Sequence, residues 1–179
     1  MNDTKVLSLG GSLVAPNEVA VDFLTAFKHL VADYLDDDPA RRLVLVIGGG
    51  APARKYQQAY RGISSNPQNS EADWIGIAAT RLNARLVKAI FEEHCLDDVV
   101  TDPTEVSAFS GRVLVASGWK PGFSTDYDAV LLAERFDAGV VVNLTNIAKV
   151  YTADPKIDKN AKPLNTVTWK EFSEITGTE

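Results

Sequence analysis

Apolar runs typical of buried strands alternate along the chain with apolar residues at helical spacing. The runs predict strands over residues 5–9, 43–47, 98–101, 112–116 and 139–144. Spacings of three and four predict helices over residues 18–34, 51–61, 73–91, 126–136 and 170–175, with an irregular stretch at 145–162. This alternation predicts an α/β fold with a mostly parallel central sheet.

Glycine-rich loops follow three of the predicted strands, at residues 10–12, 48–50 and 117–126. Parallel strands bring their carboxyl ends to one edge of the sheet, where such folds bind ligands. A glycine loop that leads into a helix offers unpaired N–H groups and a positive dipole end, which suit a phosphate or a carboxylate. Arg54 follows the second loop and can add a bidentate contact to such an anion. The pattern therefore predicts an anion site.

Length and composition limit the possible functions. A chain of 179 residues fits one domain, and its net charge of −6 disfavours nucleic acid as a partner. The single cysteine, Cys95, excludes an internal disulfide and suits a reducing compartment. The polar start is no signal peptide, and no apolar run is long enough to span a bilayer. We therefore expect a cytoplasmic protein that binds neither a membrane nor nucleic acid.

Several known chemistries do not fit the sequence. The second loop matches the loose dinucleotide fingerprint, but residues 64–70 are polar where a second strand ending in an acidic residue is required. A Walker A loop and a nucleophile elbow are both absent. His29 and His94 lie in predicted helices without ligand spacing. His94 and Cys95 are adjacent, and adjacent side chains on a helix point apart, so we interpret both as structural.

Phosphoryl transfer without a P-loop remains. It needs donors around the phosphates, a cation, and a metal held by a carboxylate. The glycine loops, the polar helix start at 124–126, Arg54 and Lys120 supply these groups. Two facing phosphate sites fit a kinase whose acceptor is itself phosphorylated.

The same residues resemble the amino-acid kinase superfamily, and most closely the archaeal-type uridylate kinases. The resemblance is carried in chain order by residues 6–12, 48–56, 118–126, 145–146 and 150–155, the last reading Val-Tyr-Thr-Ala-Asp-Pro. It implies a three-layer αβα sandwich, a homo-oligomer, and the reaction ATP + UMP → ADP + UDP with Mg²⁺, a step of pyrimidine nucleotide biosynthesis.

The resemblance also implies site residues. On the UMP side they are Gly48, Gly49 and Arg54 for the phosphate, Asp73, Gly76 and Gly118 for the rest of the substrate, and Thr125 and Asp126 beside the acceptor phosphate. Thr125 and Asp126 are the catalytic candidates, and Asp126 is the metal candidate. On the ATP side they are Gly10, Gly11 and Thr145 for the phosphates, and Asn146, Tyr151 and Asp154 for the rest of the pocket.

Some of these residues have a simpler interpretation as well. Asp73 stands at the predicted start of its helix, where a carboxylate usually caps, and the capping and binding roles can coexist. Tyr151 beside an apolar strand is equally expected as a core aromatic residue. Lys120 is either a weak candidate or a solvated loop charge. The helix that contains Trp74 either packs on the sheet or forms a subunit interface.

Three departures from the family pattern keep other functions open. Ser8 stands where many members carry lysine, Ala148 and Lys149 replace an Asp-Gly pair, and the sequence stops at Glu179, before the expected last helix and strands. We therefore expect a truncated chain with a weakened ATP side. A non-catalytic nucleotide- or oxyanion-binding module is one alternative. A kinase for another phosphorylated acceptor, such as isopentenyl phosphate, is the other.

Overall fold

The computed structural model describes residues 3–147, 149–153, 155 and 157–176. The chain divides into two compact units, Met1–Thr145 and Asn146–Glu179. Each unit has its own sheet. The assignment of residues 1–179 to a single domain stays a prediction.

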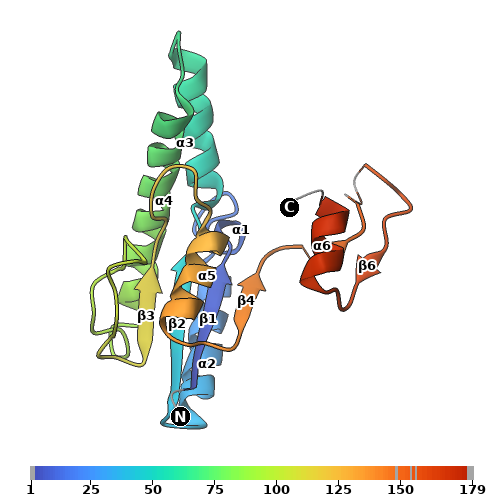
Figure 1. Ribbon diagram of the computed structural model, residues 1–179. Helices are drawn as coiled ribbons and strands as arrows, with labels where there is room; N and C mark the ends of the chain where they lie inside the picture. Colours follow the sequence, from blue (N-terminus) through green and yellow to red (C-terminus); the bar gives the residue numbers. More distant parts are fainter. Residues whose placement is uncertain (1–2, 148, 154, 156, 177–179) are drawn as a thin grey trace. The chain divides into compact units, whose positions relative to one another are not determined.

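Parallel strands form the sheet of the first unit: β1 (Asp3–Leu9), β2 (Arg41–Ile47), β3 (Val113–Ala116) and β4 (Val141–Leu144). Their order is β3-β2-β1-β4, and each neighbouring pair is parallel. The register aligns Leu9 with Ile47 and with Leu144. The carboxyl ends of β1, β2 and β4 therefore lie together at one edge (Figure 1).

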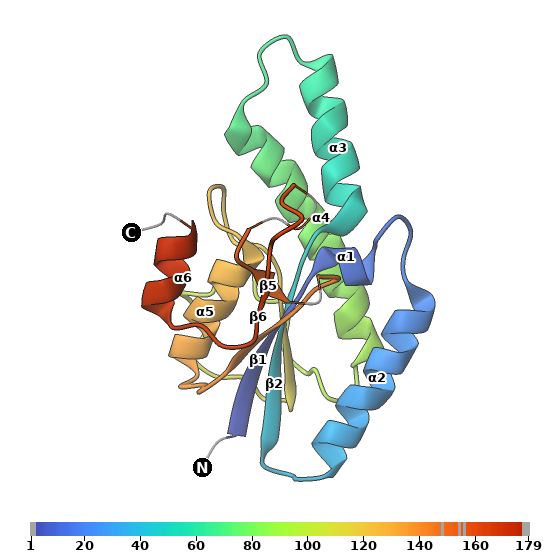
Figure 2. The ribbon, with the colours of Figure 1, turned by 90° about the vertical axis from the view of Figure 1, so that its right-hand side faces the viewer.

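Helices cover both faces of this sheet. The helices of the first unit are α1 (Gly11–Val14), α2 (Val21–Asp36), α3 (Gly50–Ile63), α4 (Asn69–Ile90) and α5 (Thr125–Arg135). Figure 2 shows α2 and α4 on one side of the strands and α5 on the other. The helices α3 and α4 form a hairpin that extends past the carboxyl ends of the strands (Figure 1). The predicted three-layer sandwich with a parallel central sheet is confirmed.

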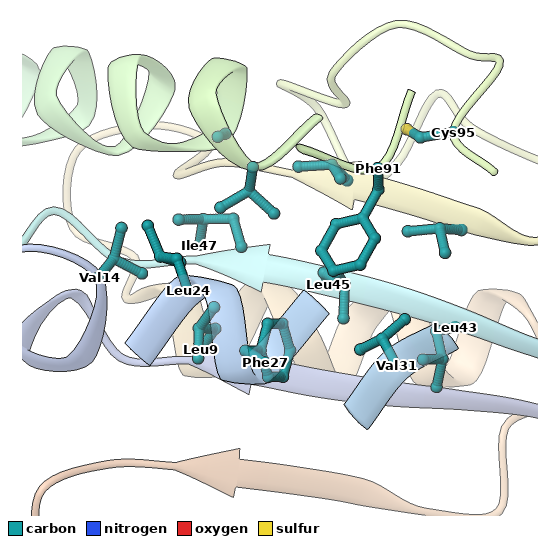
Figure 3. Close-up of a cluster of buried hydrophobic side chains, with 14 of the residues drawn as sticks. Leu9, Val14, Leu24, Phe27, Val31, Leu43, Leu45, Ile47, Phe91 and Cys95 are labelled. Atoms are coloured by element: carbon teal, nitrogen blue, oxygen red, sulfur yellow. The ribbon is translucent and has the colours of Figure 1, made fainter. Parts of the chain in front are cut away.

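The sheet separates two apolar clusters, which explains the continuous apolar run of β2. Leu43, Leu45 and Ile47 pack with α2 and α4, whereas Val44 and Val46 pack with α5. Figure 3 shows the first cluster, in which Phe27 of α2 meets Phe91 edge to face. Cys95 packs in the same cluster, and burial raises the pKa of its thiol. Its position agrees with the structural role expected for it.

The structure corrects three local predictions. Residues 98–101 form no strand, because Val100 makes only an isolated bridge to Ala116. Asp73 is not an N-cap: α4 begins at Asn69, four residues earlier, since polar residues also suit the first turn of a helix. The expected apolar face of α4 does not pack on the sheet throughout, since Trp74 is 44% exposed and Leu82 is 69% exposed.

The second unit is small. The antiparallel strands β5 (Val150–Tyr151) and β6 (Pro163–Leu164) are followed by α6 (Trp169–Thr176). Thr168 and Glu171 form a capping box at the start of α6: the Glu171 N–H donates to Thr168 Oγ1, and the Thr168 N–H donates to Glu171 Oε2. In the part of the chain that the structure describes, no helix combines the length and apolarity needed to cross a membrane.

Candidate functional site

The first two glycine loops touch at the carboxyl edge of the sheet. The Gly48 N–H donates to the Leu9 carbonyl over 2.9 Å. A Cβ atom on Gly11 would stand 2.0 Å from the backbone nitrogen of Gly50, and Gly50 has a positive φ of 66°. Only glycine permits both this approach and this conformation. The ends of β1 and β2 therefore form one continuous backbone surface.

A buried side chain of α4 holds the second loop. Asn83 is 4% exposed, and its Nδ2 donates to the carbonyl oxygens of Gly48 at 2.8 Å and Gly49 at 3.2 Å. These two hydrogen bonds engage the carbonyl oxygens of Gly48 and Gly49 on the side that faces α4. At the start of α3, the Ala51 N–H donates to the Ala15 carbonyl at 2.9 Å and the Ala53 N–H donates to the Gly49 carbonyl at 3.5 Å, while Pro52 has no N–H group. The start of α3 therefore offers an anion the positive end of the helix dipole rather than a row of unpaired N–H groups.

A cleft of about 500 Å³ lies beside this loop, within the range typical of small-molecule sites. Its walls come from α3, α4 and the segment that leads into α5. The lining residues are Gly49, Ala53, Gln57, Asp73, Gly76, Ile77, Thr80, Gly118, Gly122, Phe123, Ser124 and Thr125. The structure thus brings together five residues expected on the UMP side: Gly49, Asp73, Gly76, Gly118 and Thr125.

Three expected UMP-side residues are not among the described wall residues: Asp126, which follows Thr125 at the start of α5, Gly48 and Arg54. Gly48 is buried behind the cleft, against the first glycine loop. Arg54 is exposed on α3, next to the lining residue Ala53, and is not among the described residues that form the walls. Its assignment to the phosphate stays a prediction.

Asp73 has a contact that its sequence position does not reveal. Its Oδ2 accepts a hydrogen bond from the N–H of Gly122 at 3.0 Å, which links α4 to the segment before α5. Phe123 of this segment stacks at a tilt on Trp119, with ring centroids 5.0 Å apart. The ammonium of Lys120 lies 3.6 Å from the centroid of the Trp119 ring, at an exposed position. Lys120 is thus a loop charge with an aromatic contact.

The catalytic candidates lie at the start of α5. Ser124 caps this helix by accepting a hydrogen bond from the N–H of Tyr127 at 3.2 Å. The hydroxyl of Ser8, at the end of β1, donates to Asp126 Oδ1 over 2.6 Å. Ser8 is thus in direct contact with the carboxylate expected at the metal. This contact holds Asp126 near the first glycine loop.

The donor set suits a magnesium ion that arrives with a nucleotide. Among the described residues there is no group of three or more His, Cys, Asp or Glu side chains that could hold a metal. Mg²⁺ commonly binds through one or two carboxylates together with substrate phosphates and water. The exposed carboxylate of Asp126 fits that mode.

The ATP-side candidates divide between the two units. The Gly10 N–H donates to the Leu144 carbonyl over 2.8 Å, so Gly10 lies beside Thr145, whereas Gly11 lies against Gly48 and Gly50. Asn146 and the half-buried Tyr151 belong to the second unit. Asp154, together with Ala148, lies outside the described residues.

Sequence reasoning missed three buried polar residues around the cleft: Thr80, Asn83 and Asp128. Thr80 lies on the same buried face of α4 as Ile77 and Ala84, and Asp128 lies on the buried face of α5. A polar residue at an apolar position of a helical pattern was the available signal. Burial raises the pKa of Asp128 to about 6, and the hydrogen bond from the Trp119 N–H partly offsets this effect.

Comparison with known proteins gives the family. The model of the amino acid kinase family matches residues 3–178. The chain belongs to this family. The uridylate kinase of Thermococcus kodakarensis is 36% identical over 95% of this chain and 74% of its own length. The uridylate kinase of Methanospirillum hungatei is 36% identical over 96% of this chain and 71% of its own length.

Solved structures agree with this assignment. The crystal structure of the uridylate kinase from Archaeoglobus fulgidus superposes with a TM-score of 0.82 at 35% identity, over 97% of this chain and 78% of that chain. The aspartate kinase from Synechocystis gives a TM-score of 0.73 at 19% identity, over 97% of this chain and 33% of that chain, which shows the shared fold. The resemblance to archaeal uridylate kinases is therefore confirmed.

Proposed function

We propose that this amino acid kinase family member transfers the γ-phosphoryl group of ATP to UMP, giving ADP and UDP. The observation that carries the proposal is the cleft of about 500 Å³, whose walls contain five of the residues expected to meet UMP. The proposal is also supported by the 35% identity to a structurally similar uridylate kinase.

The acceptor would occupy the cleft beside the second glycine loop. The second glycine loop, at Gly48 and Gly49, and the guanidinium of Arg54 would hold its phosphate. Asp73, Gly76 and Gly118 would contact the remainder. Thr125, at the first position of α5, would lie beside the acceptor phosphate. In this arrangement catalysis consists of positioning and of electrostatic stabilisation of the transferred group.

ATP would bind toward the first glycine loop. Gly10, Gly11 and Thr145 would meet its phosphates, and Asn146, Tyr151 and Asp154 would line the rest of the pocket. Asp126 would hold Mg²⁺, which supplies charge neutralisation on the transferred phosphoryl group when it is bound. Ser8 would keep the Asp126 carboxylate in place.

Titration calorimetry with UMP, followed by a coupled assay of ADP release with UMP and Mg-ATP, tests the proposal. We expect UMP binding and UMP-dependent ADP release. Binding of UMP without turnover would contradict the kinase and support a nucleotide-binding module. ADP release with isopentenyl phosphate, in the absence of UMP binding, would identify another acceptor.

The proposal includes a cytoplasmic protein that assembles with copies of itself. The side chains of Tyr56, Trp74 and Leu82 on the α3–α4 hairpin are 72%, 44% and 69% exposed, respectively, which favours a contact surface there. A monomeric mass in solution at working concentration would contradict the assembly.

A further inference from the structure

Two buried side chains hold consecutive amides in the wall of the cleft. The Gly118 N–H donates to Thr80 Oγ1 at 2.9 Å, and the Trp119 N–H donates to Asp128 Oδ2 at 3.2 Å. Thr80 belongs to α4 and is 7% exposed, whereas Asp128 belongs to α5 and is fully buried. The chain is therefore held between two helices at the point where it leaves β3.

The Thr80 hydroxyl has a fixed orientation. It donates to the carbonyl of Ile77, in its own helix, over 2.7 Å. Its proton is thus committed, and a lone pair faces the Gly118 amide. Gly118 approaches closely, since a Cβ atom there would lie 3.0 Å from Thr80 Oγ1. This contact sets the distance between α4 and the segment.

The burial of the Asp128 carboxylate is energetically unfavourable, although the carboxylate holds the Trp119 amide. Its second oxygen, Oδ1, is buried and has no hydrogen-bond partner among the described residues. A buried carboxylate oxygen without a partner destabilises a fold, and an apolar side chain would fill the same place more favourably. Stability alone therefore does not explain an acid at this position, whereas control of the Trp119 amide does.

The segment that these side chains hold forms much of the cleft. Beyond Gly118 it supplies Gly122, Phe123, Ser124 and Thr125 to the walls, and it ends at the capped start of α5. Small shifts of the two held amides would be passed along this short segment to the residues that face the acceptor.

We propose that Thr80 and Asp128 are positioning residues of the acceptor site, which act by fixing the backbone at Gly118 and Trp119. The inference rests on the proposed function, because it takes the cleft to be the UMP site. Both side chains act through the segment, and neither is required to touch the substrate.

Calorimetry with UMP on paired variants tests the inference. Thr80→Val keeps the shape and removes the acceptor oxygen, and Thr80→Ser restores it. Asp128→Ala removes the acceptor oxygen, and Asp128→Asn restores one. We expect Thr80→Val and Asp128→Ala to raise the Kd for UMP about tenfold, and the restoring variants to stay within about twofold of the natural protein.

Thr25→Val is the matched control, because Thr25 also donates from a helix to a backbone carbonyl, that of Val21, far along the chain on α2. It should leave the Kd for UMP unchanged. If the natural protein binds UMP and all four variants bind it equally well, the inference is overturned while the proposed function stands. Failure of the natural protein itself to bind UMP would instead overturn the proposed function, and this inference with it.

Discussion

The two glycine loops at the edge of the sheet differ in which unit of the chain contributes the residues around them. The second loop, at Gly48–Gly50, has its supports within the first unit: Asn83 behind it, and the cleft between α3, α4 and the segment before α5. The first loop, at Gly10–Gly11, has Thr145 beside Gly10 in the first unit, whereas the ATP-side candidates Asn146 and Tyr151 belong to the second unit. The roles of the UMP-side residues can therefore be tested one residue at a time.

Gly11→Ala should have the largest effect on stability and binding, because it places a methyl group where the two loops touch. The new Cβ would lie 2.0 Å from the Gly50 nitrogen, so two backbone segments must separate. We expect a loss of about 3 kcal/mol or more in the free energy of unfolding, and weaker binding of both UMP and ATP. Denaturant unfolding and calorimetry measure these losses.

Gly62→Ala is the control for this substitution. Gly62 lies in α3, and a Cβ atom there meets nothing within 4 Å. It should raise stability by about 0.5–1 kcal/mol through helix propensity. Equal stability of Gly11→Ala and the natural protein would show that the loops do not depend on their contact.

Asp128→Asn should remove a pH dependence that arises on the UMP side. The pKa of Asp128 is raised from 3.8 to about 6 by burial. Between about pH 4 and about pH 6 the folded state keeps a proton that the unfolded chain has released, so the free energy of unfolding falls as pH rises. The full shift corresponds to about 3 kcal/mol.

Denaturant unfolding of both proteins from about pH 4 to about pH 7 measures this difference. The natural protein should lose stability relative to the Asn variant as pH rises, and parallel curves would contradict the burial of a charge. Asp98→Asn is a control of opposite sign. Hydrogen bonding to Lys88 lowers the pKa of the exposed Asp98, so its contribution is lost as pH falls.

The sequence predicted the helices and strands better than it predicted the hydrogen bonds that hold the site together. The run of β2 is apolar because both of its faces are covered, and this local pattern predicted the strand. The start of α4 was misplaced because its first turn is polar and has no side-chain cap. The hydrogen bond from Gly118 to Thr80 joins residues 38 apart, and periodicity carries no information about such a pair.

Arg54→Ala should separate the two sides of the site. Arg54 is exposed on α3, so its removal should leave stability nearly unchanged. If it binds the acceptor phosphate, the affinity for UMP should fall by about 2 kcal/mol, the value of a charged hydrogen bond, with no change for ATP. Lys55→Ala, at the next exposed position, removes an equal charge as a control. Equal losses from both variants would indicate a general charge effect.

Ser8→Ala should have the smallest effect on stability, and it should change turnover without changing the affinity for UMP. The Ser8 hydroxyl donates to Asp126 Oδ1 over 2.6 Å, and its loss should cost about 1 kcal/mol of stability. Because Asp126 would hold the metal rather than UMP, turnover should fall about tenfold with the Kd for UMP unchanged. Ser110→Ala is the control, since Ser110 also donates to a carboxylate, Asp97 Oδ1, outside the site. Undiminished turnover in Ser8→Ala would show that Asp126 needs no support from β1, whereas a parallel loss of UMP binding would show that the end of β1 also shapes the acceptor side.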